Sequence, residues 1–380
     1  MSHGRYRSPR GTRRHVLAAT LLLAGITAPL TSRAAQSGAT VIRLGSPVEI
    51  AGEGATATGG HVEITAGGVY ELSGQVADGQ VEVNAPDADV ELVLAGVDIT
   101  SRDGPAILVR DAGNASVTLA PGSTNRVEDG GDTDFDAAIA ADVSLTFGGE
   151  GALEVVGTQN EGIASSMHLT FTGGDIHVQA VEDGLNANND DVSVITISGG
   201  TLFVETETGD GIDSNGTITI TGGQVTTQGA MADMNGGLDA DGAVTIEGGE
   251  VIATGARNSV PVAVSQQQSL LLQFDQAQAA QTLIVIRDSA GKDVLVFAPA
   301  IAFQQLIVSD ARISADEVYT YSTGGTAEGE ATNGRYASAT DPGTEVRTVT
   351  TASLDEARNR RGPGGPPPDG AAPAEGEPAA

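Results

Sequence analysis

Carboxylate and amide side chains recur at fixed places in the middle of the chain. They flank a Gly-Ile or Gly-Leu step that appears as Glu161-Gly-Ile-Ala-Ser, Asp183-Gly-Leu-Asn-Ala, Asp210-Gly-Ile-Asp-Ser and Gly236-Gly-Leu-Asp-Ala. A Gly-Gly pair follows each step, at residues 173–174, 199–200, 222–223 and 248–249. A repeat of about 25 residues with this punctuation is typical of a solenoid, in which equivalent positions of successive coils stack. An acid that occurs once per repeat then becomes a column of acids.

Aligning the repeats gives three such columns. The residue before the Gly-Ile/Leu step contributes Glu161, Asp183 and Asp210. The residue after it contributes Ala164, Asn186, Asp213 and Asp239, and the position two residues further on contributes Ser166, Asn188, Asn215 and Asp241, with Asp190 and Asp191 nearby. Carboxylates stacked about 5 Å apart repel one another unless a cation neutralises them.

Calcium suits such a mixture, because Ca²⁺ accepts roughly six to eight carboxylate, amide and backbone oxygens in flexible geometry. The alternative is plain turn chemistry, since Asp and Asn side chains commonly bond to their own backbone in turns. The alignment of acids in adjacent coils favours calcium. The candidate ligands are Asp183, Asn186, Asp210, Asp213, Asn215, Asp239 and Asp241.

The strands that position these residues are indicated by period-two alternation around each Gly-Gly pair. Apolar residues stand four before, two before and two after the pair, as in Ile195, Ile197 and Leu202. Thr170, Thr196, Thr219 and Thr245 occupy the outward position between them. Alternation places the apolar set inside, and Gly tolerates the positive φ of a bend. We therefore predict an all-β fold, a right-handed parallel β-helix over about residues 60–257.

The remaining chain divides by composition. Residues 258–323 contain longer hydrophobic runs, which predict a small antiparallel β cap on the open end of the solenoid, where an unpaired strand edge would invite aggregation. Residues 324–380 become polar and rich in Pro and Gly, so we expect a disordered acidic tail. The solenoid domain is expected to occupy residues 35–257.

Residues 1–34 have the pattern of a twin-arginine signal peptide. Arg13-Arg14 precede an apolar run from Val16 to Leu30, and Ser32-Arg33-Ala34 offers a cleavage site. The apolar run is interrupted by Gly25 and Pro29, which disfavours a transmembrane helix. We expect twin-arginine export to the periplasm or the exterior, with no membrane span after signal removal.

The charge of the chain restricts its partners. The formal net charge is −31 and cysteine is absent, which excludes disulfides and thiolate metal sites. So acidic a surface repels nucleic acid and anionic membranes and attracts divalent cations. We expect a monomer.

Catalysis has weak support in the sequence. Pectate lyases and polygalacturonases also use parallel β-helices, but a lyase needs a basic group beside its calcium, and the single Lys, Lys292, lies in the C-terminal unit. None of Arg102, Arg110, Arg126 and Arg257 accompanies the acidic columns. His168 and His177 stand on outward strand positions without a nucleophile pattern. Two alternatives stay open beside a non-catalytic binder: a polysaccharide lyase with an Arg base, and a structural, surface-layer or ice-binding solenoid built on the threonine row.

Several segments taken together resemble the bacterial carbohydrate-binding domain-containing family. They are Val90-Glu-Leu-Val-Leu-Ala-Gly-Val-Asp-Ile-Thr, Gly104-Pro-Ala-Ile, Gly122-Ser-Thr-Asn, the coils at Asp183 and Asp210, Ile218-Thr-Ile-Thr-Gly-Gly and Ala298-Pro-Ala-Ile-Ala-Phe-Gln. The family is typified by a clostridial protein that binds polygalacturonate and carries calcium on a right-handed parallel β-helix. The resemblance covers roughly residues 40–323. It implies a secreted, non-catalytic, calcium-containing binder of acidic polysaccharide, with the seven candidate ligands above as matching turn positions.

Overall fold

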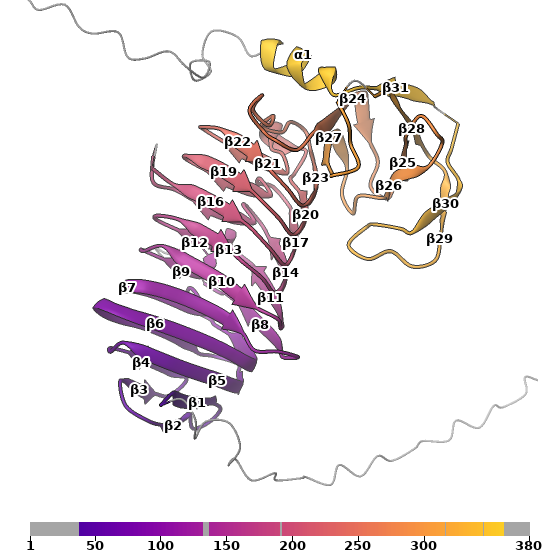
Figure 1. The fold of residues 1–380 in the computed structure, drawn as a ribbon. Helices are drawn as coiled ribbons and strands as arrows, with labels where there is room; N and C mark the ends of the chain where they lie inside the picture. Colours follow the sequence, from indigo (N-terminus) through magenta and orange to yellow (C-terminus); the bar gives the residue numbers. More distant parts are fainter. Residues whose placement is uncertain (1–37, 132–136, 191, 316, 345, 361–380) are drawn as a thin grey trace, which may run out of the picture. The chain divides into compact units, whose positions relative to one another are not determined.

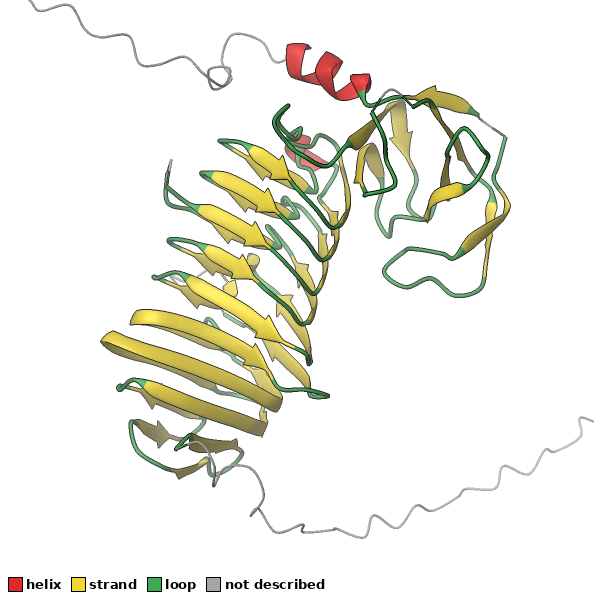
Figure 2. Cartoon of the chain, viewed as in Figure 1, coloured by secondary structure: helices red, strands yellow, loops and turns green. Residues whose placement is uncertain are grey.

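The computed structural model describes residues 38–131, 137–190, 192–315, 317–344 and 346–360, and strands make up most of these segments (Figure 1). The proposed signal peptide, residues 1–34, lies outside the described residues, as do Asp191 and residues 361–380. The short strands repeat along the chain as coils joined by loops, and the helix α1 (Ala352–Arg360) comes after the last strand (Figure 2). The prediction of an all-β parallel solenoid with a small antiparallel C-terminal sheet is confirmed.

The coils form three stacks of parallel strands. The first stack contains β1 (Thr40–Leu44), β5 (Gly68–Val76), the second halves of β6 (Gln80–Thr100) and β7 (Ile107–Leu119), β10 (Leu145–Gly149), β13 (Leu169–Phe171), β16 (Val194–Ile197), β19 (Thr217–Ile220) and β22 (Val244–Ile246). The second contains the end of β6, then β8 (Thr124–Glu128), β11 (Ala152–Gly157), β14 (Asp175–Ala180), β17 (Thr201–Thr206), β20 (Gln224–Gln228) and β23 (Glu250–Gly255). The third contains β4 (His61–Ile64), the first halves of β6 and β7, β9 (Ala137–Ala141), β12 (Glu161–Ser165), β15 (Leu185–Ala187), β18 (Ile212–Ser214) and β21 (Leu238–Ala240). A short 3-10 turn, η2 (Ala232–Met234), precedes β21.

The interior of the coils is filled by the predicted apolar positions. The twelve inward residues of the four regular coils are at most 3% exposed: Leu169, Phe171, Ile176, Ile195, Ile197, Leu202, Ile218, Ile220, Val225, Val244, Ile246 and Val251. Phe147 and Phe171 stack with ring centroids 5.0 Å apart, one coil above the other. Burial of each such side chain contributes about 1.5–3 kcal/mol. The threonine row faces outward in register, with Thr170, Thr196, Thr219 and Thr245 as successive cross-strand partners.

The second glycine of each pair makes the bend between the first and second stacks. Gly174, Gly200, Gly223 and Gly249 have φ between +81° and +91°. A Cβ on Gly200 would lie 2.5 Å from the carbonyl oxygen of Gly174 in the preceding coil. The bend therefore requires glycine for two reasons, because the conformation is left-handed and the coils approach too closely for a side chain.

Both ends of the solenoid are covered. At the N-terminal end, β2 (Glu49–Ala51) and β3 (Ala55–Thr58) pair antiparallel with β1 and β4. At the other end, β27 (Phe303–Ser309) pairs antiparallel with β23 and with β24 (Ser269–Gln278). The loop of residues 256–268 covers the other two edges, because Asn258 Oδ1 accepts from Leu238 N and Ser265 Oγ accepts from Ile246 N. These contacts satisfy edge groups that would otherwise pair with another chain.

The C-terminal unit extends further than the sequence indicated. A four-stranded antiparallel sheet has the order β26 (Asp293–Phe297), β25 (Ile284–Arg287), β28 (Tyr319–Thr323), β31 (Arg347–Val349), and β29 (Thr326–Glu328) pairs with β30 (Ser338–Asp341). The expectation of a tail without structure from residue 324 is therefore wrong up to residue 360. Two buried apolar side chains anchor this polar segment. Val349, 7% exposed, packs in the core of the C-terminal sheet, and Leu354, 4% exposed, packs in the core of the solenoid.

Arg335 also anchors the segment. Its guanidinium donates to Thr226 Oγ1 and pairs with Glu250 at 3.0 Å, on the outer side of β20 and β23. No helix among the described residues is long and apolar enough to cross a membrane.

Candidate functional site

Four aspartates from three successive coils interact on the outer side of the third stack. Asp183 and Asp210 occupy the turns before β15 and β18, whereas Asp213 and Asp239 lie on β18 and β21. Asn186, Asp213 and Asp239 are direct cross-strand partners, so their side chains follow one another at the strand spacing of about 4.8 Å. We call Asp183, Asn186, Asp210, Asp213 and Asp239 the aspartate cluster.

Local backbone geometry explains why these side chains face outward. The three-residue strands β15, β18 and β21 bury their first and third residues and leave the middle one facing out, as with Ile212, Asp213 and Ser214 on β18. The glycines before the strands admit the close packing of the coils, since a Cβ on Gly211 would meet Thr227 Oγ1 at 1.8 Å. The Gly-Ile/Leu step therefore fixes the register that places one polar side chain per coil on this surface.

The turn aspartates have a structural task as well. Asp183 Oδ1 accepts from the backbone N of Asp210 at 2.7 Å, and Asp210 Oδ1 accepts from the backbone N of Gly236 at 2.5 Å. Each carboxylate thus holds the backbone of the next coil by a hydrogen bond, a role that Asp side chains commonly have in turns. Asp183 Oδ2 accepts from Asn186 Nδ2 at 2.9 Å, which joins the first column to the second.

The cluster is under electrostatic strain. Burial raises the pKa of Asp183, and the carboxylates of Glu182 and Asp239 raise it further. Burial together with Asp239 and Asp183 raises the pKa of Asp210 to about 7. Burial and then the carboxylates of the cluster raise the pKa of Asp213 to about 8. The charges that most affect the pKa of Asp213 are all carboxylates, so they oppose its ionised form.

The seven candidate ligands divide into two groups. Asp183, Asn186, Asp210, Asp213 and Asp239 come together as the cluster. Asn215 lies apart, where its Nδ2 donates to Asp190 Oδ1 at 2.7 Å and to the Asn188 carbonyl. Asp241 is exposed just beyond β21, and it acts on Asp213 only as the smallest of the charges that raise its pKa.

The oxygen donors of the cluster are of the kinds that calcium binds, but they do not form a complete coordination shell. Within the described part of the chain, no three or more His, Asp or Glu side chains are grouped so that they could hold a metal ion. Asn186 Oδ1, however, is buried and has no hydrogen-bond partner, so an amide oxygen stands available beside Asp183. Oxygen donors of mixed charge fit Ca²⁺, with backbone or water oxygens completing the shell, and do not fit an ion held by carboxylates alone.

Two sites were missed by sequence reasoning. Asp129 is 5% exposed, and its Oδ1 accepts from the backbone N of Thr158 at 2.6 Å, the same bracing that Asp183 performs. The repeat pattern did not predict this role because Asp129-Gly130-Gly131 lacks the Gly-Ile/Leu step. An acid before a glycine pair is the feature of the sequence that could have indicated it. Arg335 had no signal, since it stands alone in a polar segment.

The histidines and arginines of the solenoid occupy structural pairs. His168 Nδ1 accepts from Val194 N, and the His177 ring packs edge-on against Phe203. Arg110 pairs with Glu82 and Arg126 with Glu128, and the latter contact raises the Arg126 pKa. A raised pKa keeps this guanidinium protonated, which opposes a role as a general base.

Comparisons with known proteins identify the family of the chain. A family model described as carbohydrate-binding domain-containing protein matches residues 58–326, and the chain belongs to this family. A carbohydrate-binding domain-containing protein of Acetivibrio thermocellus is 35% identical over 129 residues, which are 32% of this chain and 45% of that protein. The chain thus spans less than half the length of that relative. A solved polysaccharide lyase-like protein from C. thermocellum, a gadolinium derivative, is 28% identical and covers 60% of this chain and 96% of its own, with a TM-score of 0.45.

Proposed function

We propose that this protein is an exported, non-catalytic module that binds acidic polysaccharide of the polygalacturonate type through calcium at the aspartate cluster. The observation that carries the proposal is the group of four outward aspartates from three coils. In three of them, Asp183, Asp210 and Asp213, burial and the neighbouring carboxylates raise the pKa. Membership of the carbohydrate-binding family supplies the ligand class. The cluster suggests an acidic ligand, because a cation bound by these carboxylates would also attract the carboxylates of a polysaccharide.

The bound cation would lie among Asp183, Asn186, Asp213 and Asp239, where it would neutralise the cluster and offer open coordination positions to a uronate carboxylate. Without it, the carboxylates of protein and polysaccharide would repel one another. The residues contribute in different ways. Asp183 and Asp210 hold the coils in register through their backbone contacts. Asp213, which is half-buried, and Asp239, which is exposed and accepts from Ser259 Oγ at 2.7 Å, follow one another at the strand spacing.

The repeat along the solenoid suits a polymer. Successive coils present equivalent positions, so a chain of uronates lying across the third stack would meet a periodic surface. A periodic surface favours binding of long chains over single sugars, because several weak contacts act together at high effective concentration.

The test is a pull-down of the mature protein on insoluble polygalacturonate, with calcium and with excess chelator, while the ultraviolet absorbance of unsaturated uronate products is followed. We expect retention in calcium, release in chelator and no absorbance change. Growth of the absorbance would instead establish the lyase alternative. Failure to bind any acidic glycan under either condition would contradict the proposal.

A further inference from the structure

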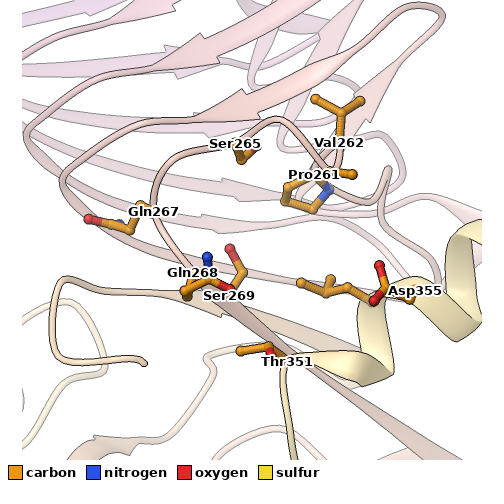
Figure 3. A pocket seen from close by; sticks show the side chains of 10 residues that line it. Pro261, Val262, Ser265, Gln267, Gln268, Ser269, Thr351 and Asp355 are labelled. Atoms are coloured by element: carbon orange, nitrogen blue, oxygen red, sulfur yellow. The ribbon is translucent and has the colours of Figure 1, made fainter. Parts of the chain in front are cut away.

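A pocket of about 290 Å³ lies at the C-terminal end of the solenoid, and none of the residues that line it belongs to the aspartate cluster (Figure 3). One wall is the loop of residues 261–268, which covers the last coil. The other is the start of β24 together with Thr351 and the first turn of α1. The volume is near the lower end of small-molecule sites, which occupy about 300–1,000 Å³.

The lining is polar and nearly uncharged. Of the described residues that line the pocket, Asp355 carries the single charge. Hydroxyl and carboxamide groups come from Ser265, Gln267, Gln268, Ser269 and Thr351. Among the described residues, no guanidinium or ammonium lines the pocket, so this lining is unsuited to phosphate, sulfate or a uronate.

The polar groups of the lining differ in their hydrogen bonds within the protein. Gln267 Nε2 donates to the Gly249 carbonyl and to Ser309 Oγ, which fixes that wall. Ser269 is 2% exposed, and its Oγ is buried without a hydrogen-bond partner. Ser269 shares a strand face with Leu271, which belongs to the same core as Leu354 of α1, so the hydroxyl is directed to the side that α1 covers.

An unsatisfied buried hydroxyl is costly unless a ligand or water completes it. Val262 and Leu354 add apolar side chains to this polar lining. A neutral sugar has this combination, because its ring carries hydroxyls at the rim and C–H groups on its faces. We propose that the pocket is a second carbohydrate site, which takes one neutral hexose unit and needs no calcium.

The experiment is titration calorimetry of the full chain with D-glucose, D-galactose and D-mannose in excess chelator. At least one hexose should bind with a stoichiometry of one. Removing two polar groups of the lining with Ser269→Ala and Gln268→Ala should weaken binding about tenfold, since each lost hydrogen bond is worth roughly two- to tenfold. Gln276→Ala, at an exposed position of the same strand, is the matched control and should bind as wild type.

Folding is checked by the melting temperature. Because Ser269 Oγ has no partner, Ser269→Ala alone should melt at or above the wild-type temperature. Absence of binding by all three hexoses, or equal binding by the pocket variant, would overturn the proposal. Asp213→Asn should retain hexose binding, so failure of this site and failure of calcium-dependent polysaccharide binding are distinguishable.

Discussion

Replacement of Asp213 by asparagine tests the electrostatics of the aspartate cluster. The pKa of this carboxyl is raised from its ordinary 3.8 to about 8, by burial first and by neighbouring carboxylates second. A raised pKa in the folded state means that folding favours the protonated form. The stabilisation is complete below the unfolded pKa and is lost as pH rises through about 8. The metal-free protein should therefore lose stability between pH 5 and pH 9.

The size of the effect follows from the shift. At about 1.4 kcal/mol per pKa unit, a rise of roughly four units sets an upper limit of about 6 kcal/mol. Partial solvent access and an effective dielectric constant near 20 reduce this, and we expect about 2 kcal/mol. Asparagine resembles the protonated acid, so Asp213→Asn should remove the contribution of this carboxyl to the pH dependence, while Asp183 and Asp210 keep theirs. The variant should be about 2 kcal/mol more stable than wild type at pH 9 in chelator.

Urea unfolding at pH 5, 7 and 9 measures this, with the two proteins compared in chelator and in millimolar calcium. Asp175→Asn, at an exposed position on β14, removes the same charge and should leave the pH dependence intact. In calcium the order should reverse, because the wild type gains stability from a ligand that binds only the folded state. A variant that is less stable than wild type at pH 9 in chelator would refute this account of the cluster.

Three further outcomes are expected. Calcium binding should release protons near pH 7, because Asp213, with a pKa of about 8, must ionise to act as a ligand, and a bound cation also favours ionisation of the neighbouring Asp210, with a pKa of about 7. Calorimetry in buffers of different ionisation enthalpy would count the protons, and no buffer dependence would contradict this. Arg335→Ala should destabilise the C-terminal unit by about 1–3 kcal/mol, since Glu250 and Thr226 lose a largely buried partner. The variant should be cleaved faster by protease between β29 and β30, and an unchanged cleavage rate would show that Arg335 does not anchor this segment. Gly200→Ala should lower the free energy of unfolding by more than about 2 kcal/mol, whereas Gly291→Ala, with a similar φ of +80° but open space around it, should lower it by about 1 kcal/mol. Equal losses in urea unfolding would show that the close contact between coils does not matter.

The regular coils were predictable from sequence because their determinants are local. Alternation about a glycine pair fixes which side of the strand faces inward, and Ile195, Ile197 and Leu202 are buried as that pattern requires. The columns were predictable for the same reason, since Asn186, Asp213 and Asp239 are cross-strand partners.

The rest depended on contacts distant in sequence. The segment after residue 324 is polar throughout, so composition indicated disorder, yet Arg335 reaches back to Glu250, and Val349 packs in the C-terminal core. The separation of Asn215 from the cluster likewise depends on Asp190, which lies in the loop of the preceding coil. Arg335 and Glu250 are 85 residues apart, a separation that the repeat pattern could not indicate.

The most direct measurement for the central proposal is the affinity of polygalacturonate for wild type and for the Asp213→Asn, Asp239→Asn double variant, titrated with calcium. The cluster account expects wild-type binding to rise with calcium and to vanish in chelator, with the double variant at least about tenfold weaker at every calcium concentration. Calcium-dependent binding of equal strength in the two proteins would contradict it, because the cation would then act elsewhere on the chain.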